Sequence, residues 1–205
     1  MLSHAQLYVG VLGGFSSLSG DSRSLMSPGS TEFSSYDPKN GGAVGGLVGV
    51  QLSDWFAIQG NYIWNSNELT LSSAEFINAA KQGYQETRGS SQQSIVGDLL
   101  VYFRNRDSRL RPYLAAGTGL VHFSSSRKRI DQLIGFPMLP PVSFSSNMLA
   151  LHIPVGMDVK LGSGWAFRYT FSETISRNPI DDHLTPSGQH TLKNFQNLFG
   201  FIKRF

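Results

Sequence analysis

The chain has 205 residues, of which 15% are charged, and its formal net charge is only +3. This length fits a single domain, and no apolar run approaches the ~20 residues that a membrane helix needs. The chain has no cysteine, which excludes disulfides and thiolate metal sites. Its basic residues fall in separate places, which argues against a nucleic-acid footprint. The richness in glycine and aromatic residues favours strands and turns over helices.

The first five residues, Met1 to Ala5, look like the end of a secretory signal. Ser3 and Ala5 occupy the two small-residue positions of a cleavage site, while the charged and apolar regions of such a signal are missing. We therefore expect residues 1–5 to be a signal remnant and Gln6 to start the mature protein. An ordinary disordered tail is the alternative.

From Gln6 onward, apolar residues recur with a period of two, which places them on one face of a strand. Connections rich in Ser, Gly, Asp and Pro separate these segments, and long connections alternate with short ones. The predicted strands cover 6–17, 41–52, 56–65, 93–104, 112–124, 148–161, 165–175 and 194–205, and the long connections cover 18–40, 66–92, 125–147 and 176–190. Within the second long connection, a capping-box pattern from Ser72 to Glu75 predicts a short helix reaching Ala80.

Two of the short turns suggest strand registers, because a slip of one residue would move every side chain to the wrong face. Each register matches apolar side chains on the outer face, and the second also places a carboxylate opposite a guanidinium inside. The predicted pairs are Val50 with Ile58, Val48 with Gly60 and Val44 with Trp64 in the first hairpin, and Leu161 with Trp165, Val159 with Phe167, Met157 with Tyr169 and Asp158 with Arg168 in the second.

The last predicted strand carries phenylalanine on one face, at 195, 199, 201 and 205. Asn197 and Lys203 interrupt that face, and the chain ends on Phe205. Exposed rings on a strand of a soluble sandwich invite aggregation. A membrane barrel needs this pattern, with rings in lipid and small or polar groups inside.

The end of this strand resembles the C-terminal signal by which bacterial outer-membrane β-barrels are recognised by their assembly machinery. The residues that carry the resemblance are Phe199, Gly200, Phe201 and Phe205, while Lys203 departs from the usual apolar residue two places before the terminal aromatic. With its eight strands and alternating connections, the whole chain resembles the small eight-stranded outer-membrane barrels, namely the OmpA-like transmembrane domains and opacity-type surface antigens.

The resemblance implies an all-β fold: an eight-stranded antiparallel up-and-down transmembrane β-barrel formed by residues 6–205 as one domain. It also implies short periplasmic turns, four long extracellular loops and a bacterial outer-membrane location, with both termini periplasmic. A soluble lipocalin-like barrel is the structural rival. The expected function is that of a non-catalytic surface protein with a structural, adhesin or antigen role through its loops. Its expected partners are outer-membrane lipid and lipopolysaccharide, the barrel assembly machinery and host surface molecules, with no nucleic acid, and we expect a monomer.

Four ionisable residues, Asp98, His152, Asp158 and Arg168, fall in the inward phase of their strands. The interior of an eight-stranded barrel is just wide enough for side chains to fill, so these charges have to pair. We expect a structural charge network in the lumen. A narrow ion path is the alternative.

His122 and Ser124 form a His-x-Ser pair, which resembles the pair of the lipid A deacylases of this barrel class. Those enzymes add a carboxylate that orients the histidine, and Glu173 is the only obvious candidate here. The Phe-x-His-x-Ser-Asn context of that family is absent. The alternation we assign to this strand turns His122 inward, with Tyr113, Ala115, Val121 and Phe123 outward. We therefore expect no enzyme, cofactor or metal, and a lipid A-modifying barrel is the alternative.

Arg127, Lys128 and Arg129 fall in a predicted external loop. Such a run can bind lipopolysaccharide phosphates or an acidic host surface through charge-assisted hydrogen bonds. A solvated basic loop is the alternative.

Overall fold

The computed structural model describes residues 5–19, 22–25, 33–77, 80–135, 139–183 and 190–205. Most of the predicted signal remnant, residues 1–4, therefore lies outside the described residues. Within the described ranges the chain forms ten strands and one short 3₁₀ helix, η1 (Asp181–His183). The strands are β1 (Gln6–Leu18), β2 (Ser22–Leu25), β3 (Phe33–Pro38), β4 (Gly41–Gln51), β5 (Phe56–Ile77), β6 (Ala80–Tyr102), β7 (Leu110–Ile134), β8 (Ser143–Gly162), β9 (Trp165–Arg177) and β10 (Thr191–Arg204).

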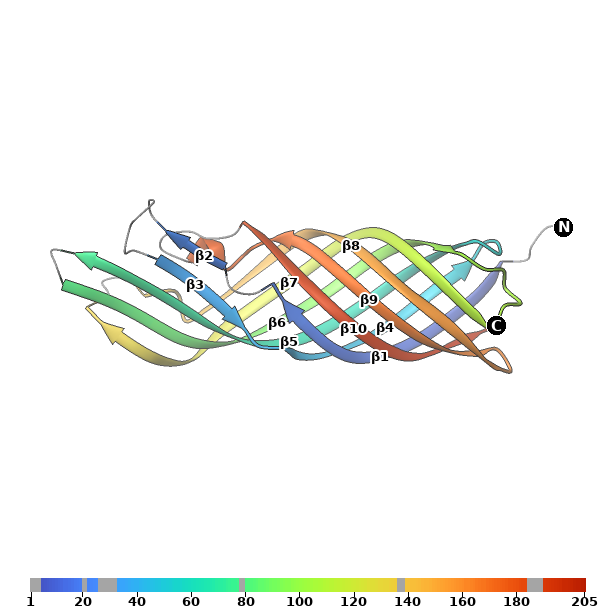
Figure 1. The fold of residues 1–205 in the computed structure, drawn as a ribbon, viewed down its shortest axis with the longest axis horizontal. Helices are drawn as coiled ribbons and strands as arrows, with labels where there is room; N and C mark the ends of the chain where they lie inside the picture. Colours follow the sequence, from blue (N-terminus) through green and yellow to red (C-terminus); the bar gives the residue numbers. More distant parts are fainter. Residues whose placement is uncertain (1–4, 20–21, 26–32, 78–79, 136–138, 184–189) are drawn as a thin grey trace.

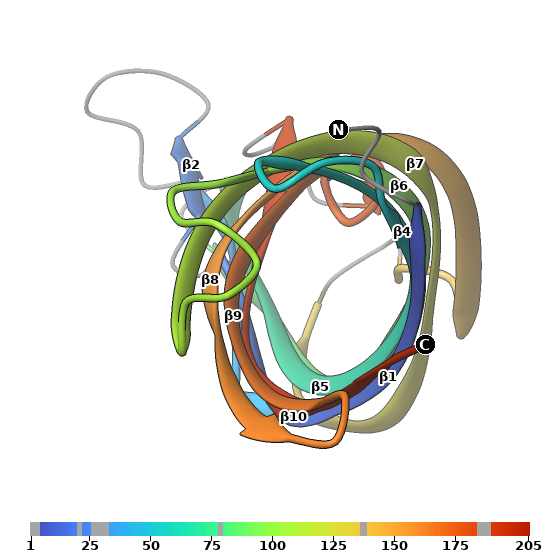
Figure 2. The same cartoon turned by 90° about the vertical axis from the view of Figure 1, so that its right-hand side faces the viewer.

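The strands form one antiparallel sheet that closes into a barrel (Figures 1 and 2). The sheet order is β2-β3-β5-β4-β1-β10-β9-β8-β7-β6, and β5 also pairs with β6. This last pairing closes a ring of eight strands where all eight overlap. Past Ser126, the described part of β7 pairs with β6 alone. Strands β2 and β3 are not members of this ring. Strand β3 pairs with the second half of β5, beyond the part of β5 that pairs with β4, and β2 pairs with β3. The predicted eight-stranded all-β barrel is confirmed.

The two ends of the barrel differ in their connections. Three short turns lie at one end, where the chain also finishes (Figure 1). The start of β1 lies there too, because Gln6 pairs with Gln51 at the end of β4 and the Phe205 amide donates to the Leu7 carbonyl at 2.9 Å. We call this the turn end and the opposite end the loop end.

The registers of the two predicted hairpins are largely confirmed. The three pairs of the first hairpin occur as predicted, as do the pairs of Val159, Met157 and Asp158 in the second. The pairing of Leu161 with Trp165 is wrong, because a bulge between Lys160 and Gly162 makes Gly162 the partner of Trp165. The turn that follows the bulge takes positive φ values at 162–164, which suits glycine at two of these three positions.

Strands β5, β6 and β7 continue far past their predicted ends, into segments predicted to be loops. The predicted helix near Ser72 is wrong, since residues up to Ile77 continue strand β5 and pair with β6. Leu69 and Leu71 alternate with polar residues and are buried inside the barrel. A strand with one buried apolar face satisfies its whole backbone through its neighbours, and this tertiary pairing outweighs a local capping pattern.

The facing of strand β7 also differs from the prediction. Tyr113, Ala115, Val121 and Phe123 point inward and are buried, so His122 points outward. The Tyr113 ring can lie in the lumen rather than in lipid, because its hydroxyl has an interior partner, the hydroxyl of Thr170, at 2.6 Å. A tyrosine can thus fill a lumen when its hydroxyl finds a hydrogen-bond partner.

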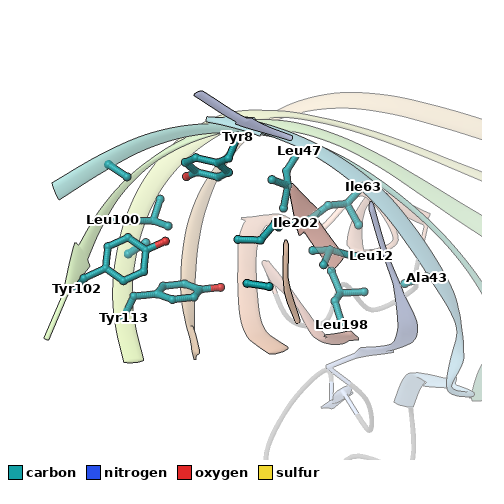
Figure 3. Close-up of a cluster of buried hydrophobic side chains, with 13 residues drawn as sticks. Tyr8, Leu12, Ala43, Leu47, Ile63, Leu100, Tyr102, Tyr113, Leu198 and Ile202 are labelled. Atoms are coloured by element: carbon teal, nitrogen blue, oxygen red, sulfur yellow. The ribbon is translucent and has the colours of Figure 1, made fainter. Parts of the chain in front are cut away.

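Apolar side chains cover the outer wall of the ring, while two buried apolar clusters occupy the inside. The outer set includes Val11, Val48, Ile58, Ile95, Leu120, Leu149, Leu161 and Phe201, each exposed. The first inner cluster includes the rings of Tyr8, Tyr102 and Tyr113 (Figure 3). The second lies nearer the loop end and includes Tyr36, Leu69 and Phe123. Among the described residues, no helix is long and apolar enough to span a membrane.

Candidate functional site

The lumen near the turn end holds an ion pair with further partners. Arg168 on β9 binds Asp158 on β8 through two hydrogen bonds, with Nε to Oδ1 at 2.6 Å and Nη2 to Oδ2 at 2.9 Å. Arg204 on β10 and the Tyr102 hydroxyl on β6 also donate to Asp158 Oδ2, at 2.7 and 3.0 Å. This buried carboxylate thus accepts four hydrogen bonds, which offset the cost of burying its charge.

A second pair lies deeper in the barrel, between Asp98 on β6 and His152 on β8. The distance from His152 Nδ1 to Asp98 Oδ1 is 2.9 Å, and Asn61 Nδ2 donates to Asp98 Oδ2 at 2.6 Å. Strand β7 lies between β6 and β8, and its residue at this level is Gly117. The two side chains meet because Gly117 has no side chain to separate them.

Two amides connect these pairs into one network. Gln59 Nε2 donates to Asn61 Oδ1 at 2.6 Å, and Gln59 Oε1 accepts from Arg168 and, at 3.0 Å, from the Tyr8 hydroxyl. The network therefore crosses the lumen between strands on opposite sides of the ring. All four predicted lumen residues belong to it, and its role as a structural network remains a prediction. The members that sequence reasoning missed are Tyr8, Gln59, Asn61, Tyr102 and Arg204, which share the same inward phase.

The loop end contains a separate buried ionic cluster. The carboxylate of Glu86 on β6 is fully buried and accepts hydrogen bonds from Arg88, Arg127 and the Tyr84 hydroxyl. Burial, followed by the hydrogen bond to Glu86, raises the pKa of Tyr84. The hydrogen bond to Glu86 likewise raises the pKa of Arg127. The Arg127 guanidinium therefore stays charged at any physiological pH.

This cluster holds the β7–β8 connection against the barrel. Arg88 Nη2 donates to the carbonyls of Pro141 at 3.0 Å and Val142 at 3.1 Å, and Arg127 donates to the carbonyl of Pro140. Pro140 and Pro141 have no amide hydrogen, so this segment cannot pair as a regular strand. Its carbonyls therefore accept hydrogen bonds from the two guanidiniums instead of from a neighbouring strand.

The basic run predicted to form a loop lies on strand β7 instead. Arg127 belongs to the buried cluster, Lys128 Nζ lies 3.1 Å from Glu68 Oε2, and Arg129 Nε lies 2.5 Å from Asp131 Oδ1. Each cation of the run thus has a carboxylate neighbour. The run forms part of a mixed-charge surface, and its role in binding remains a prediction.

A row of serines crosses the outer wall just above the apolar side chains. Ser66, Ser91, Ser124 and Ser145 are successive register partners on β5, β6, β7 and β8. They line an open depression of about 560 Å³, one pleat beyond Trp64 on β5. Small hydroxyl side chains leave this wall hollow and polar. Sequence reasoning missed the row because it assigned Ser66, Ser91 and Ser145 to loops and placed Ser124 at the end of a predicted strand.

The structure does not bring the alternative catalytic residues together. The His122 ring lies on the outer wall, with Nδ1 2.7 Å from Asn147 Oδ1, and Ser124 belongs to the serine row. Glu173 lies on β9, which β8 separates from β7, and pairs with Lys193 at 3.1 Å. A carboxylate this remote cannot orient the imidazole as a nucleophile's base requires.

The residues of the predicted assembly signal lie along β10. Phe199 and Phe201 face outward and contact aromatic rings of β9 at centroid distances of 5.0 and 5.8 Å. A Cβ at Gly200 would lie 1.9 Å from a backbone oxygen of β1, so the strands there approach too closely for another residue. Phe205 is exposed, and Lys203 donates to the carbonyl of the β8–β9 turn at 2.5 Å. Recognition by the assembly machinery remains a prediction.

A closed barrel with an apolar outer wall and its ionic groups inside defines an integral outer-membrane β-barrel protein. The chain belongs to the outer membrane protein beta-barrel domain family, whose model matches residues 3–198. The resemblance inferred from the sequence is therefore confirmed, and the protein is located in the bacterial outer membrane.

Several solved structures share the fold at low sequence identity. Neisserial surface protein A (NspA) is 11% identical with a TM-score of 0.58, over 99% of this chain and 100% of that chain. Ail of Yersinia pestis is 11% identical with a TM-score of 0.51, over 98% and 99%. The outer membrane protein AlkL is 14% identical with a TM-score of 0.54, over 100% and 92%. No curated protein matches the chain in sequence.

Proposed function

We propose that the chain is a non-catalytic surface protein that presents the loop end of its barrel outside the cell, with both chain ends in the periplasm, and acts as an adhesin or surface antigen. The observation that supports this is the length of β5, β6 and β7. A tilted membrane strand needs only about 9 to 11 residues, whereas these strands have 22, 23 and 25. About half of each strand therefore stands beyond the membrane.

The parts of β5, β6 and β7 that stand beyond the membrane form a rigid extension, which we call the platform. Its strands continue the barrel ladder, and the buried cluster of Glu86, Arg88 and Arg127 fixes the β7–β8 connection to it. A pre-organised surface loses less conformational entropy on binding than a mobile loop does, which favours a role in recognition.

The chemistry of the platform favours acidic, hydroxyl-rich partners. The serine row lies where the apolar wall ends, at the height of lipid headgroups, so the sugars and phosphates of lipopolysaccharide are its nearest partners. Lys128 and Arg129 have exposed ammonium and guanidinium groups in weak surface pairs that a polyanion can replace. The structure of Ail has been solved in complex with the heparin analogue sucrose octasulfate. We propose that a sulfated glycan is also a partner of this chain.

The test is binding of heparin to the full chain in lipid nanodiscs. Removing both exposed cations with Lys128→Gln and Arg129→Gln is expected to weaken binding about 25-fold, at about 1 kcal/mol for each contact. Arg177→Gln, which removes an equally exposed cation paired with Asp182, is the control and should leave affinity unchanged. Equal affinity for the wild type and the double variant would refute a role for the platform.

The enzyme alternative is tested separately. Lipid A from cells that express the wild type, His122→Ala or no barrel is compared by mass spectrometry. We expect three identical profiles, because the imidazole has no carboxylate beside it. A mass change in lipid A that depends on His122 would replace the proposed function with catalysis.

A further inference from the structure

A basic pocket of about 370 Å³ opens at the turn end of the lumen. Four cationic side chains line it, those of Arg106, Arg111, Lys160 and Arg204, and Asp107 is the one carboxylate in its lining. None of the loop-end residues discussed above contributes to it. The charge of the lining points to an anionic ligand.

Two of these cations form no salt bridge with a carboxylate in the part of the chain that the structure describes. The Arg111 side chain is buried, with 2% exposure, and donates to neutral oxygens: the Gln51 side chain at 3.3 Å and the Asp54 carbonyl at 2.8 Å. Its guanidinium also lies 3.9 Å from the centre of the Tyr102 ring. Lys160 forms no salt bridge with any residue that the structure describes.

Each of the other two cations has a carboxylate partner. Arg106 pairs with Asp54 at 3.3 Å, and Arg204 shares Asp158 with Arg168. When these partners are counted with the lining, five cations face three carboxylates. The mouth therefore keeps an excess of two positive charges, which an anion would offset.

A second, apolar groove of about 230 Å³ adjoins this pocket on the outer wall. It crosses the seam where the first and last strands meet, because Val9 pairs with Lys203 and Val11 with Phe201. Its lining is Val9, Gly10, Val11, Trp165, Phe201 and Lys203. Trp165 lines both the groove and the basic pocket, so the two cavities meet at the rim of the barrel.

We infer that pocket and groove together bind one anionic phospholipid, with its phosphate among the cations of the mouth and an acyl chain in the groove. A basic pocket alone would fit any phosphate, but the shared Trp165 joins it to a lipid-facing apolar groove. Tryptophan and lysine are the residues that proteins place at the membrane interface. This inference rests on the proposed function in one respect, the orientation of the barrel. With the turn end on the periplasmic side, the bound lipid belongs to the periplasmic leaflet of the outer membrane.

The experiment is calorimetric titration of the full chain, refolded in an uncharged detergent. The probes are dihexanoyl phosphatidylglycerol, dihexanoyl phosphatidylcholine and inorganic phosphate. We expect phosphatidylglycerol to bind most tightly. Lys160→Gln should weaken it about fivefold, since one basic residue near a membrane surface is worth about 1 kcal/mol. Lys39→Gln, which removes an exposed lysine at the loop end, should leave it unchanged.

A second variant separates the two sources of phosphate. Val11→Phe adds a ring on the lipid face of the groove and should weaken phosphatidylglycerol while leaving inorganic phosphate unaffected. Equal binding of phosphatidylcholine and phosphatidylglycerol, wild-type affinity in Lys160→Gln, or no effect of Val11→Phe would each overturn the inference. These titrations do not involve the loop end, so they can fail while heparin binding succeeds, and the reverse.

Discussion

At the scale of single residues, a missing side chain determines how the lumen is packed. Asp98 and His152 belong to strands that are not neighbours, and they meet across Gly117 of the strand between them. A Cβ at Gly117 would lie 2.2 Å from Asp98 Oδ1 and 2.0 Å from the Gly97 carbonyl oxygen. Any larger residue would therefore displace one partner of a buried hydrogen-bonded pair and leave the other without its partner.

Gly117→Ala is accordingly expected to destabilise the barrel by about 1 to 3 kcal/mol, the usual cost of overpacking. Unfolding by urea in lipid vesicles measures the loss. Gly97→Ala is the matched control, because a Cβ there meets nothing within 4 Å. Equal stability of the two variants would contradict the interpretation that Gly117 makes room for the pair.

The surface carboxylate Glu68 provides a prediction of pH dependence at the loop end. Hydrogen bonds from Lys39 and then Lys128 lower the pKa of Glu68 to about 2. Because the folded pKa is depressed, the bridge is fully present above the ordinary pKa of 4.5 and is lost only as the pH falls through about 2. Carboxyl carbon shifts in an NMR titration should report that midpoint. Lys128→Gln should raise it, and a wild-type midpoint at 4.5 would show that the bridge does not form in solution.

At the scale of strands, the period of two predicts those segments whose two faces differ in polarity. The hairpin of β8 and β9 is such a case, since lipid-facing apolar residues alternate with Asp158 and Arg168. The predicted facing of strand β7 is wrong because its inner face holds the rings of Tyr113 and Phe123. Aromatic rings are also typical of a lipid-facing side. Where the sequence does not show which face of a strand points inward, the pairing with the neighbouring strands decides it. That pairing is determined only in the closed sheet.

The extensions of β5, β6 and β7 could not be predicted for a related reason. Beyond the membrane these strands are rich in polar residues, and an alternation as short as that of Leu69 and Leu71 does not outweigh the loop-like composition and the capping pattern around it. Of the lumen network, Asp98, His152, Asp158 and Arg168 follow from their phase. The amides of Gln59 and Asn61 do not, because nothing in the sequence shows that they lie between the Asp158–Arg168 pair and the Asp98–His152 pair.

The buried cluster of the extension should control the β7–β8 connection. Arg88→Met keeps the side-chain volume but removes one partner of a buried pair, which costs about 3 to 5 kcal/mol locally, and it leaves two carbonyls of the connection without their donor. We expect faster amide hydrogen exchange across 139–147. Arg129→Met, which removes a surface pair, is the control and should leave exchange there unchanged. Unchanged exchange in Arg88→Met would show that the guanidinium does not hold the connection.

At the scale of the whole molecule, the barrel is closed around its circumference and filled along its axis. The pairing of β5 with β6 removes the last edge, which a membrane requires because lipid offers no hydrogen bonds to a free strand. Inside, one apolar cluster lies toward the turn end and another toward the loop end. The polar network links strands on opposite sides of the same interior. We therefore expect the lumen to work as a core rather than as a channel.

A filled lumen predicts that the protein conducts no ions. In planar bilayers we expect no current steps above the leak. As a control for folding, the same sample should migrate differently on a gel before and after heating. A double variant, Tyr8→Ala and Tyr113→Ala, removes two rings of the turn-end cluster and the hydroxyl that binds Gln59. It should produce small steps if its barrel still folds by the gel criterion. Discrete steps from the wild type would instead mean that the network lines an ion path, because a rigid interior packed with paired charges leaves an ion no other route.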